Sequence, residues 1–217
     1  MIGFFQCWLK EDKIMEMLEK SQYQKASKIL QNGGLIAFPT ETVYGLGVVF
    51  DNEQSYERLI NVKRRPPEKP FTLMCGSLDD IKKYAYVNEL AQKLIDAFMP
   101  GQFTIILKAK ENLPRWVVSK EGNVGIRISD DKFVQNLIIE TGKPLLVPSA
   151  NRSGEKPCHT SNEVKDSLGN DLDAIIIGES VSNIPSTIVF VDDSVHIIRL
   201  GEISESEIKN VIKEKNN

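Results

Sequence analysis

The chain of 217 residues lacks several features that would assign it to a well-known class of protein. No run of about 18 apolar residues occurs, so we expect no membrane span. It has three cysteines, Cys7, Cys75 and Cys158, and no CxxC or CxxH spacing, so neither a disulfide framework nor a zinc site is predicted. The apolar N-terminal stretch is short, has no preceding positive charge and is not expected to be a signal peptide. These absences favour a cytoplasmic protein with reduced thiols.

Common nucleotide-binding and hydrolase motifs are also missing. The Walker, Rossmann, HExxH and GxSxG patterns do not occur, so any bound nucleotide must lie against a loop of another kind. The net charge of −3 argues against a large basic face for duplex nucleic acid. The 27 basic residues still leave room for a local cationic cleft.

Length and composition favour one globular domain. Hydrophobic residues make up 41% of the chain and charged residues 26%, which are ordinary values. We predict one domain over residues 1–217, with residues 1–20 as an N-terminal extension and residues 205–217 as a C-terminal helix and tail.

Hydrophobic periodicity predicts an α/β fold with a mixed sheet, because several strands follow one another without intervening helices. Helices are predicted over residues 10–32, 52–63, 78–84, 88–98, 131–141 and 161–168, with a last one starting at Ser204 or Ser206. Strands are predicted over residues 35–38, 47–51, 71–75, 103–109, 124–129, 144–147, 174–177, 187–191 and 196–200.

Three polar segments interrupt these elements. Residues 38–47 (FPTETVYGLG) supply hydroxyls, residues 63–70 (KRRPPEKP) supply cations braced by prolines, and residues 147–154 (VPSANRSG) follow a short apolar strand. Ligands of open α/β sheets bind beyond the carboxyl ends of strands. Together the segments predict a pocket for a small, polar, anionic ligand. Taken singly, the first is equally well an ordinary turn, and the second is more often a solvated charge run.

The order of these segments resembles the YrdC family of threonylcarbamoyl-AMP synthases. The matching stretches are GLIAFPTETVYGLG (34–47), VKRRPPEKP (62–70), MPGQFTIIL (99–107), VGIRIS (124–129), PLLVPSANRSGEKPCHT (144–160), IPSTIVFV (184–191) and IIRLGEIS (197–204). The resemblance runs from about residue 20 to 204 and fits the short, single-domain form of the family. It implies a twisted mixed sheet flanked by helices on both faces and a deep, positively charged cavity.

The resemblance also implies an activity. Enzymes of this family join L-threonine, bicarbonate or CO₂ and ATP into L-threonylcarbamoyl-AMP and release pyrophosphate, with Mg²⁺ expected to be bound through the ATP phosphates. A downstream tRNA threonylcarbamoyl-transferase complex then modifies the adenosine next to the anticodon. Weak tRNA binding is a further expectation, and no protein metal ligand is expected.

Site residues follow from the resemblance, position by position. The catalytic residues are Lys63 and Arg65. L-Threonine and bicarbonate are expected to contact Thr40, Thr42, Tyr44, Arg127, Ser149 and Ser186. ATP is expected to contact Arg65, Lys69, Thr104, Asn151, His159 and Arg199. Arg64 is expected to face solvent. Met74 stands where many relatives carry His, and His159 stands where relatives often carry a hydroxyl residue or Arg.

Two other functions are compatible with the same residues. The cationic cleft could belong to a non-catalytic module that binds tRNA or rRNA, although few aromatic residues lie among its basic residues. A carbamoyl-transfer enzyme with another acceptor is the third hypothesis. Threonine-dependent release of pyrophosphate distinguishes the synthase from both.

Overall fold

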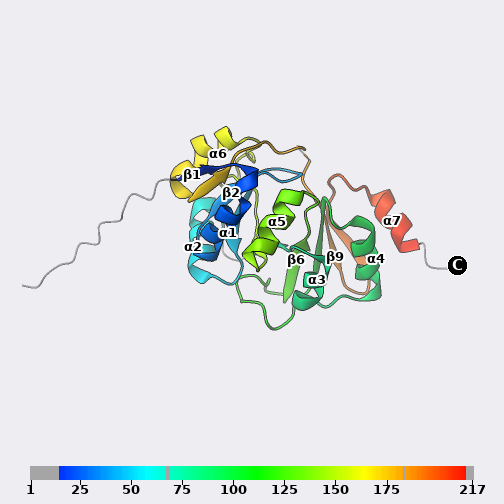
Figure 1. Ribbon diagram of the computed structural model, residues 1–217. Helices are drawn as coiled ribbons and strands as arrows, with labels where there is room; N and C mark the ends of the chain where they lie inside the picture. The colour runs from blue at the N-terminus through cyan, green and yellow to red at the C-terminus, as the bar shows by residue number, and fades with distance from the viewer. Residues whose placement is uncertain (1–14, 67–68, 183, 214–217) are drawn as a thin grey trace, which may run out of the picture.

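The strands of this protein, described here from a computed structural model, form one mixed sheet (Figure 1). The structure describes residues 15–66, 69–182 and 184–213, so the predictions for residues 1–14 and 214–217 lie outside the described residues. Within the described residues the sheet has ten strands in the order β1-β8-β2-β3-β7-β4-β6-β5-β9-β10. Their bounds are β1 Glu16–Leu18, β2 Ile36–Phe38, β3 Gly45–Val49, β4 Leu73–Met74, β5 Phe103–Lys108, β6 Asn123–Arg127, β7 Leu145–Leu146, β8 Ala174–Ile176, β9 Thr187–Val191 and β10 Val195–Arg199.

Parallel and antiparallel pairs both occur, which confirms the predicted mixed sheet. β8 pairs in parallel with β1 and β2, β4 with β6, and β5 with β9. The remaining neighbours are antiparallel. The described α-helices are α1 Tyr23–Gln31, α2 Glu53–Lys63, α3 Leu78–Tyr84, α4 Glu89–Phe98, α5 Lys132–Thr141, α6 Ser161–Leu168 and α7 Glu205–Lys213, with 3₁₀ turns η1 Lys20–Gln22 and η2 Gly169–Asp171.

Helix ends follow the local signals in the sequence. Asn52 caps α2 by accepting a hydrogen bond from the Ser55 amide. Asp131 caps α5 in the same way, and Gly142 ends that helix in the left-handed region with φ of 75°. These caps explain why most predicted helices agree with the structure to within a residue or two.

The predicted helix over residues 10–32 is wrong over residues 15–22, whereas residues 10–14 lie outside the described part of the chain. Residues Glu16–Leu18 form strand β1, which pairs with Ala174–Ile176, and the α-helix begins only at Tyr23. The apolar residues Met17 and Leu18 fit a helical pattern, but in the structure they pair with a strand more than 150 residues away in the sequence. Local periodicity carries no information on such a distant partner.

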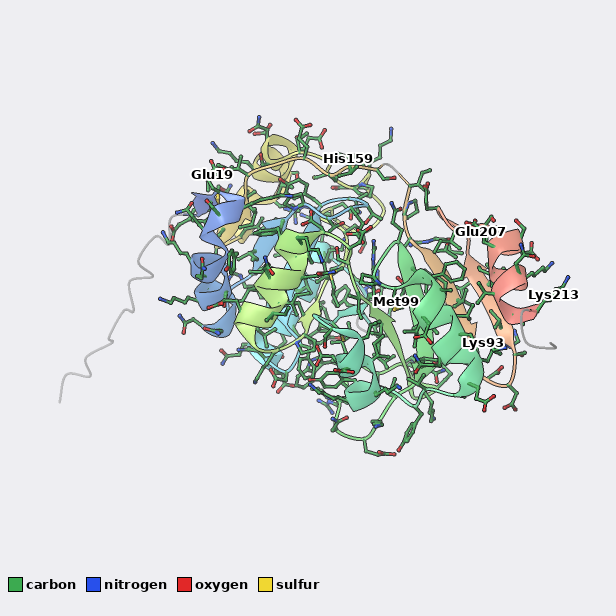
Figure 2. All side chains as sticks on the ribbon, turned by 45° about the vertical axis from the view of Figure 1, so that its right-hand side comes forward. Glu19, Lys93, Met99, His159, Glu207 and Lys213 are labelled. Carbon is green, nitrogen blue, oxygen red and sulfur yellow. The ribbon has the colours of Figure 1, made fainter. Side chains whose placement is uncertain are left out.

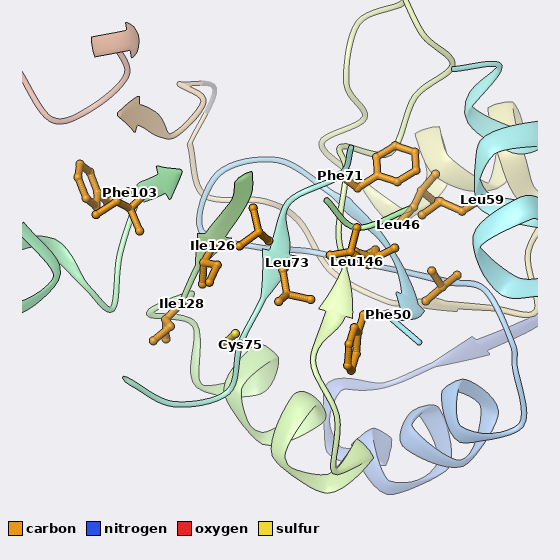
Figure 3. Close-up of a cluster of buried hydrophobic side chains, with 14 of the residues drawn as sticks. Leu46, Phe50, Leu59, Phe71, Leu73, Cys75, Phe103, Ile126, Ile128 and Leu146 are labelled. Atoms are coloured by element: carbon orange, nitrogen blue, oxygen red, sulfur yellow. The ribbon is translucent and has the colours of Figure 1, made fainter. Parts of the chain in front are cut away.

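The sheet is packed against helices on both faces. Along β2 and the residue before it, Ile36 and Phe38 belong to one hydrophobic cluster, whereas Leu35 and Ala37 belong to another, as the two-residue period of a strand requires. The first cluster includes side chains of α1 and α5, which lie next to each other in Figure 1. The second includes side chains of α2, α4 and α6, and Figure 3 shows its centre around Leu73 and Leu146.

No helix in the described part of the chain has both the length and the apolar character needed to cross a bilayer.

Candidate functional site

A cavity of about 490 Å³ is lined by residues of β3, β4, β5, β6, β9 and β10 and of the segments before β3 and after β7. This volume falls in the usual range of small-molecule sites. Ten of the thirteen predicted site residues line the cavity: Thr40, Thr42, Tyr44, Arg65, Thr104, Arg127, Ser149, His159, Ser186 and Arg199. The segments predicted to meet, 38–47, 63–70 and 147–154, therefore do meet.

Neighbouring strands place the cavity on the same face of the sheet as the hydrophobic cluster that contains α5. On that face Val49 pairs with Leu145 and Leu145 with Met74, and Val49 and Leu145 belong to that cluster. Met74 then pairs with Arg127, which lines the cavity. Beyond them, Thr104 and Arg199 both pair with Ile188, and all three line the cavity.

The residues next to Met74, Arg127 and Thr104 along their strands point to the other face, where Leu73, Ile126, Phe103 and Ile105 are buried in the core. The same strands therefore supply core on one face and site on the other.

Arg127 is held by three groups. Its Nη2 donates to Glu41 Oε1 at 2.5 Å, its Nε to the Gly101 carbonyl at 3.2 Å, and its Nη1 to Thr42 Oγ1 at 3.4 Å. Ser129 Oγ donates to the other oxygen of Glu41. Arg127 and Glu41 are each only 7% exposed, so this is a buried ion pair with a fixed orientation.

A hydroxyl pair lies above this arginine. Thr40 Oγ1 donates to the Val43 carbonyl at 2.7 Å and accepts from the Thr42 amide at 3.1 Å. The two hydroxyls of Thr40 and Thr42 are 3.0 Å apart. Because Thr40 donates its only hydroxyl proton to Val43, Thr42 is the donor in that pair, and its oxygen faces Arg127 as an acceptor.

A second cation stands beside a second hydroxyl pair. Arg199 donates from Nε and Nη2 to the Ser186 carbonyl at 3.1 and 2.8 Å, and Thr104 Oγ1 is 3.0 Å from Ser186 Oγ. Burial lowers the pKa of Arg199, and the nearby charge of Arg127 lowers it further. Because the positive charges of these two guanidinium groups repel each other, an anionic ligand between them is favoured.

The proline-braced segment turns Arg65 inward. Its Nε donates to the Lys69 carbonyl at 3.0 Å and its Nη2 to the Pro70 carbonyl at 3.3 Å, and its guanidinium lies 5.0 Å from the Phe71 ring centroid. Arg64 adopts φ of 50° at the end of α2 and is exposed, as expected. Lys69 is also exposed and does not line the cavity.

Lys63 and Asn151 lie behind the cavity lining and contact Ser149. Lys63 Nζ donates to the Ser149 carbonyl at 2.6 Å and to Asn151 Oδ1 at 2.9 Å. Ser149 Oγ donates to the same amide oxygen at 2.6 Å. Lys63 is 2% exposed, and burial, followed by the charge of Arg65, lowers its pKa from 10.5 to about 8.

Tyr44 and His159 border the site but are bonded elsewhere. The hydroxyl of Tyr44 lies 2.8 Å from the carbonyls of Ile176 and Gly178, and burial raises the pKa of Tyr44 to about 12. His159 precedes α6 at the upper edge of the molecule in Figure 2, and its Nδ1 is 3.0 Å from Ser180 Oγ. Tyr44 therefore joins the segment of residues 38–47 to the end of β8.

Gly45 has a packing role. A side chain there would begin 2.6 Å from Val147 Cγ1, so glycine is needed where β3 passes the segment after β7.

Two residues that matter to this geometry were not predicted from the sequence. Glu41 lies inside the motif between two threonines, and its burial beside a cation 86 positions away has no local signal. Arg152 lies within the SANRSG segment, where its long side chain looks like a solvated one. In the structure, it bonds to the end of α2 and to Asp171.

Within the described part of the chain, the site contains no protein cage for a metal ion. Among residues 15–66, 69–182 and 184–213, no group of three or more His, Cys, Asp or Glu side chains could hold one. The two cysteines in this part of the chain, Cys75 and Cys158, are free and buried.

Comparison with known proteins identifies the family. Residues 28–201 match the family described as Telomere recombination, which groups Sua5, YciO and YrdC. The chain is 37% identical over 170 residues to the threonylcarbamoyl-AMP synthase of Vibrio campbellii, covering 76% of this chain and 92% of that protein.

Two solved structures share the fold. P. abyssi Sua5 complexed with L-threonine superimposes with a TM-score of 0.86 and 29% identity, covering 93% of this chain but 61% of the Sua5 chain. E. coli YciO superimposes with a TM-score of 0.81 and 27% identity, covering 90% of this chain and 98% of YciO. The chain belongs to the Sua5/YciO/YrdC family, whose curated members include enzymes named threonylcarbamoyl-AMP synthase.

Proposed function

We propose that this protein is a threonylcarbamoyl-AMP synthase, a nucleotidyltransferase that makes L-threonylcarbamoyl-AMP from L-threonine, bicarbonate and ATP. The product is proposed to serve threonylcarbamoyl modification of the adenosine next to the anticodon of tRNA, through a separate transferase complex. The observation that carries the proposal is a cavity of about 490 Å³ whose lining combines three arginines with the Thr40–Thr42 and Thr104–Ser186 hydroxyl pairs. The likeness to a Sua5 structure complexed with L-threonine supports it.

The threonine end of the cavity is proposed to be formed by Thr42 and Arg127. The Arg127 guanidinium is fixed on one side by Glu41 and presents Nη1 beside the Thr42 hydroxyl. A fork of parallel donors suits the carboxylate of an amino acid. Holding the amino acid by its carboxylate would leave its amine free to react.

The first bond formed is between the threonine nitrogen and the bicarbonate carbon. The amine and bicarbonate give a carbamate and one water. A carbamate oxygen then attacks the α-phosphorus of ATP, and the bond from that phosphorus to the bridging oxygen breaks, so pyrophosphate leaves. No covalent enzyme intermediate is required. Alignment of bound reactants can lower such a barrier by roughly 7–11 kcal/mol.

The phosphate end is proposed to lie at Arg65 and Arg199. Both guanidinium groups line the cavity, and both are anchored through backbone carbonyls, so their positions are set before a ligand arrives. Preorganised cations stabilise the charge that develops during phosphoryl transfer. Thr104 and His159, which also line the cavity, are proposed to contact the nucleotide, and Lys69 is proposed to reach its phosphates from outside the lining.

Lys63 and Asn151 are proposed to act through the loop that they hold. Their contacts fix the Ser149 carbonyl and hydroxyl at the cavity wall, between the two proposed ends. A buried ammonium group there also adds positive potential next to the phosphates and the carbamate.

Mg²⁺ is proposed to arrive with the nucleotide. The described residues form no acidic cage for it, and Mg²⁺ commonly binds through nucleotide phosphates with few protein ligands. No step above is assigned to the metal ion.

The direct test is a reconstitution with purified protein, L-threonine, bicarbonate, ATP and Mg²⁺. We expect pyrophosphate release that requires threonine and bicarbonate together, and a mass corresponding to threonylcarbamoyl-adenylate in the products. Equal pyrophosphate release without threonine would contradict the proposal. Turnover with carbamoyl phosphate in place of threonine would favour carbamoyl transfer, and salt-sensitive tRNA binding without turnover would favour the RNA-binding module.

A further inference from the structure

Arg152 joins two parts of the molecule that flank the proposed phosphate end. Its Nη1 donates to the Val62 carbonyl at 3.2 Å, in the last turn of α2, and its Nη2 lies 3.1 Å from Asp171 Oδ2, in η2. A cation at the C-terminal end of a helix interacts favourably with the helix dipole. Arg152 therefore holds the loop after β7 against two rigid elements at once.

The same loop encloses Lys63. The Ser153 amide donates to the Lys63 carbonyl at 2.7 Å, while the Lys63 ammonium donates to the Ser149 carbonyl and to Asn151 Oδ1. Lys63 is thus bonded to the loop through both its backbone and its side chain. Its burial depends on the loop staying in place.

Asn151 transmits the position of Arg152 to Lys63. Its Nδ2 donates to the carbonyls of Arg152 and Glu155, both at 2.8 Å, and its Oδ1 accepts from Lys63. The amide is therefore tied to both sides of the loop. A displacement of the Arg152 backbone would move the Asn151 oxygen away from the ammonium group.

We propose that Arg152 is a positioning residue, which fastens the loop of residues 149–155 to α2 and η2 and so keeps Lys63 buried and facing Ser149. The proposal rests on the proposed synthase function for its effect on catalysis, but the geometry that it describes can be tested without any substrate. Arg152 does not line the cavity and is not assigned a contact with substrate.

The charge state of Lys63 reports on this arrangement. Burial lowers its pKa to about 8, the charge of Arg65 adds to the lowering, and Cys158 and Glu155 act in the opposite direction. If the loop detaches, water reaches the ammonium group and the largest cause of the lowering disappears. The pKa of Lys63 then rises toward 10.5.

The test measures the reaction of Lys63 with acetic anhydride as a function of pH, by peptide mass spectrometry of the full chain. In the parent protein we expect slow labelling with a midpoint near pH 8. In Arg152→Ala we expect labelling to be roughly tenfold faster at high pH, since one ion pair and one hydrogen bond to a carbonyl are lost. Its midpoint should lie at least one pH unit higher.

Three variants make the result specific. Asp171→Asn removes the charge partner but keeps the Val62 contact, so a smaller shift in the same direction is expected. Arg152→Lys should restore part of the protection, because a lysine reaches one of the two acceptors. Arg115→Ala removes an exposed arginine of the β5–β6 connection and should leave the midpoint unchanged.

An unchanged midpoint in Arg152→Ala, with the fold intact by circular dichroism, would overturn the proposal. So would an equal shift in Arg115→Ala. If Arg152→Ala does not fold, Asp171→Asn decides, because a midpoint identical to the parent would also overturn it.

Catalysis gives a second readout. We expect the alkaline limb of kcat/KM for ATP, which reports the free enzyme, to move to higher pH in Arg152→Ala, with kcat/KM at pH 7 lowered roughly tenfold. A labelling shift without any threonine-dependent turnover in the parent protein would reject the synthase and keep the positioning role. Threonine-dependent turnover in the parent protein with no labelling shift in Arg152→Ala would keep the synthase and reject the positioning role.

Discussion

Two buried cations at this site have different kinds of partner. Arg127, on the sheet side, has the carboxylate of Glu41 at 2.5 Å and a backbone carbonyl at 3.2 Å. Lys63, on the loop side, has a carbonyl and an amide oxygen, and no carboxylate of the described residues forms a salt bridge with it. Both are under 10% exposed, so burial alone does not separate them.

The difference assigns them different tasks. A cation with a buried carboxylate is fixed in place, so it can hold the carboxylate of a ligand in one orientation. A cation that is hydrogen-bonded only to neutral groups is costly to bury, and it is stabilised when an anion arrives. We infer that Arg127 sets geometry whereas Lys63 supplies positive potential. The variants below are chosen to break or sharpen this contrast.

The largest effect is expected from Arg127→Met. This change leaves the Glu41 carboxylate buried with Ser129 as its one hydrogen-bond donor among the described residues, and we expect the free energy of unfolding to fall by roughly 3–5 kcal/mol. Urea unfolding followed by circular dichroism measures it.

The double variant Arg127→Met/Glu41→Gln is the control for Arg127→Met. It removes both charges and should recover most of the lost stability. If the double variant were as unstable as the single one, the ion pair would not be the reason for the loss.

A smaller effect on stability, but a clear one on activity, is expected from Lys63→Met. Met has a similar length and leaves no buried charge, so the free energy of unfolding at pH 7 should change by less than about 1 kcal/mol. Threonine-dependent pyrophosphate release should fall by roughly 100-fold or more, because a preorganised cation is lost. The matched control is Lys120→Met at an exposed lysine. Full activity of Lys63→Met would remove Lys63 from the proposed chemistry.

The pH dependence of stability separates the two cations further. In the folded protein the pKa of Lys63 is about 8, whereas in the unfolded chain it keeps its ordinary value of 10.5. Below pH 8 both states hold the proton, and the cost of burying the charge is present in full. Between about pH 8 and 10.5 the unfolded state binds more protons, so this contribution to stability rises with pH.

The measurement is the difference in free energy of unfolding between the parent protein and Lys63→Met across that window. We expect the parent to gain stability relative to the variant as pH rises from 8 to 10. A difference that stays constant would mean that Lys63 is solvated in the folded state.

Much of the fold was predictable because its signals are local. Asn52 and Asp131 cap helices that begin where the sequence indicates, and Gly142 ends α5. The strand β1 was not predictable, since Met17 finds its partner Ile175 across most of the chain. Short strands such as Leu145–Leu146 also depend on neighbours more than on their own sequence.

The site divides in the same way. Arginine and hydroxyl side chains indicate an anion-binding pocket by their chemistry. In the structure Arg65, Thr42 and Ser186 all line the cavity. Which cation receives a carboxylate depends on the fold that brings Arg127 beside Glu41, 86 positions away, and no spacing in the sequence encodes it. The same holds for Arg152, whose role appears only when Asp171 is brought beside it.

The smallest effect is expected at Arg64, next to Lys63 in sequence but exposed. Its φ of 50° lies in the left-handed region, which costs an L-residue roughly 1–2 kcal/mol, while glycine loses more entropy on folding. Arg64→Gly should therefore raise the free energy of unfolding by less than about 1 kcal/mol and leave threonine-dependent turnover within about threefold of the parent. Thermal unfolding and the pyrophosphate assay measure both. A large loss of activity would mean that an exposed cation of this segment is required as well, and the distinction between a buried cation and an exposed neighbour would fail.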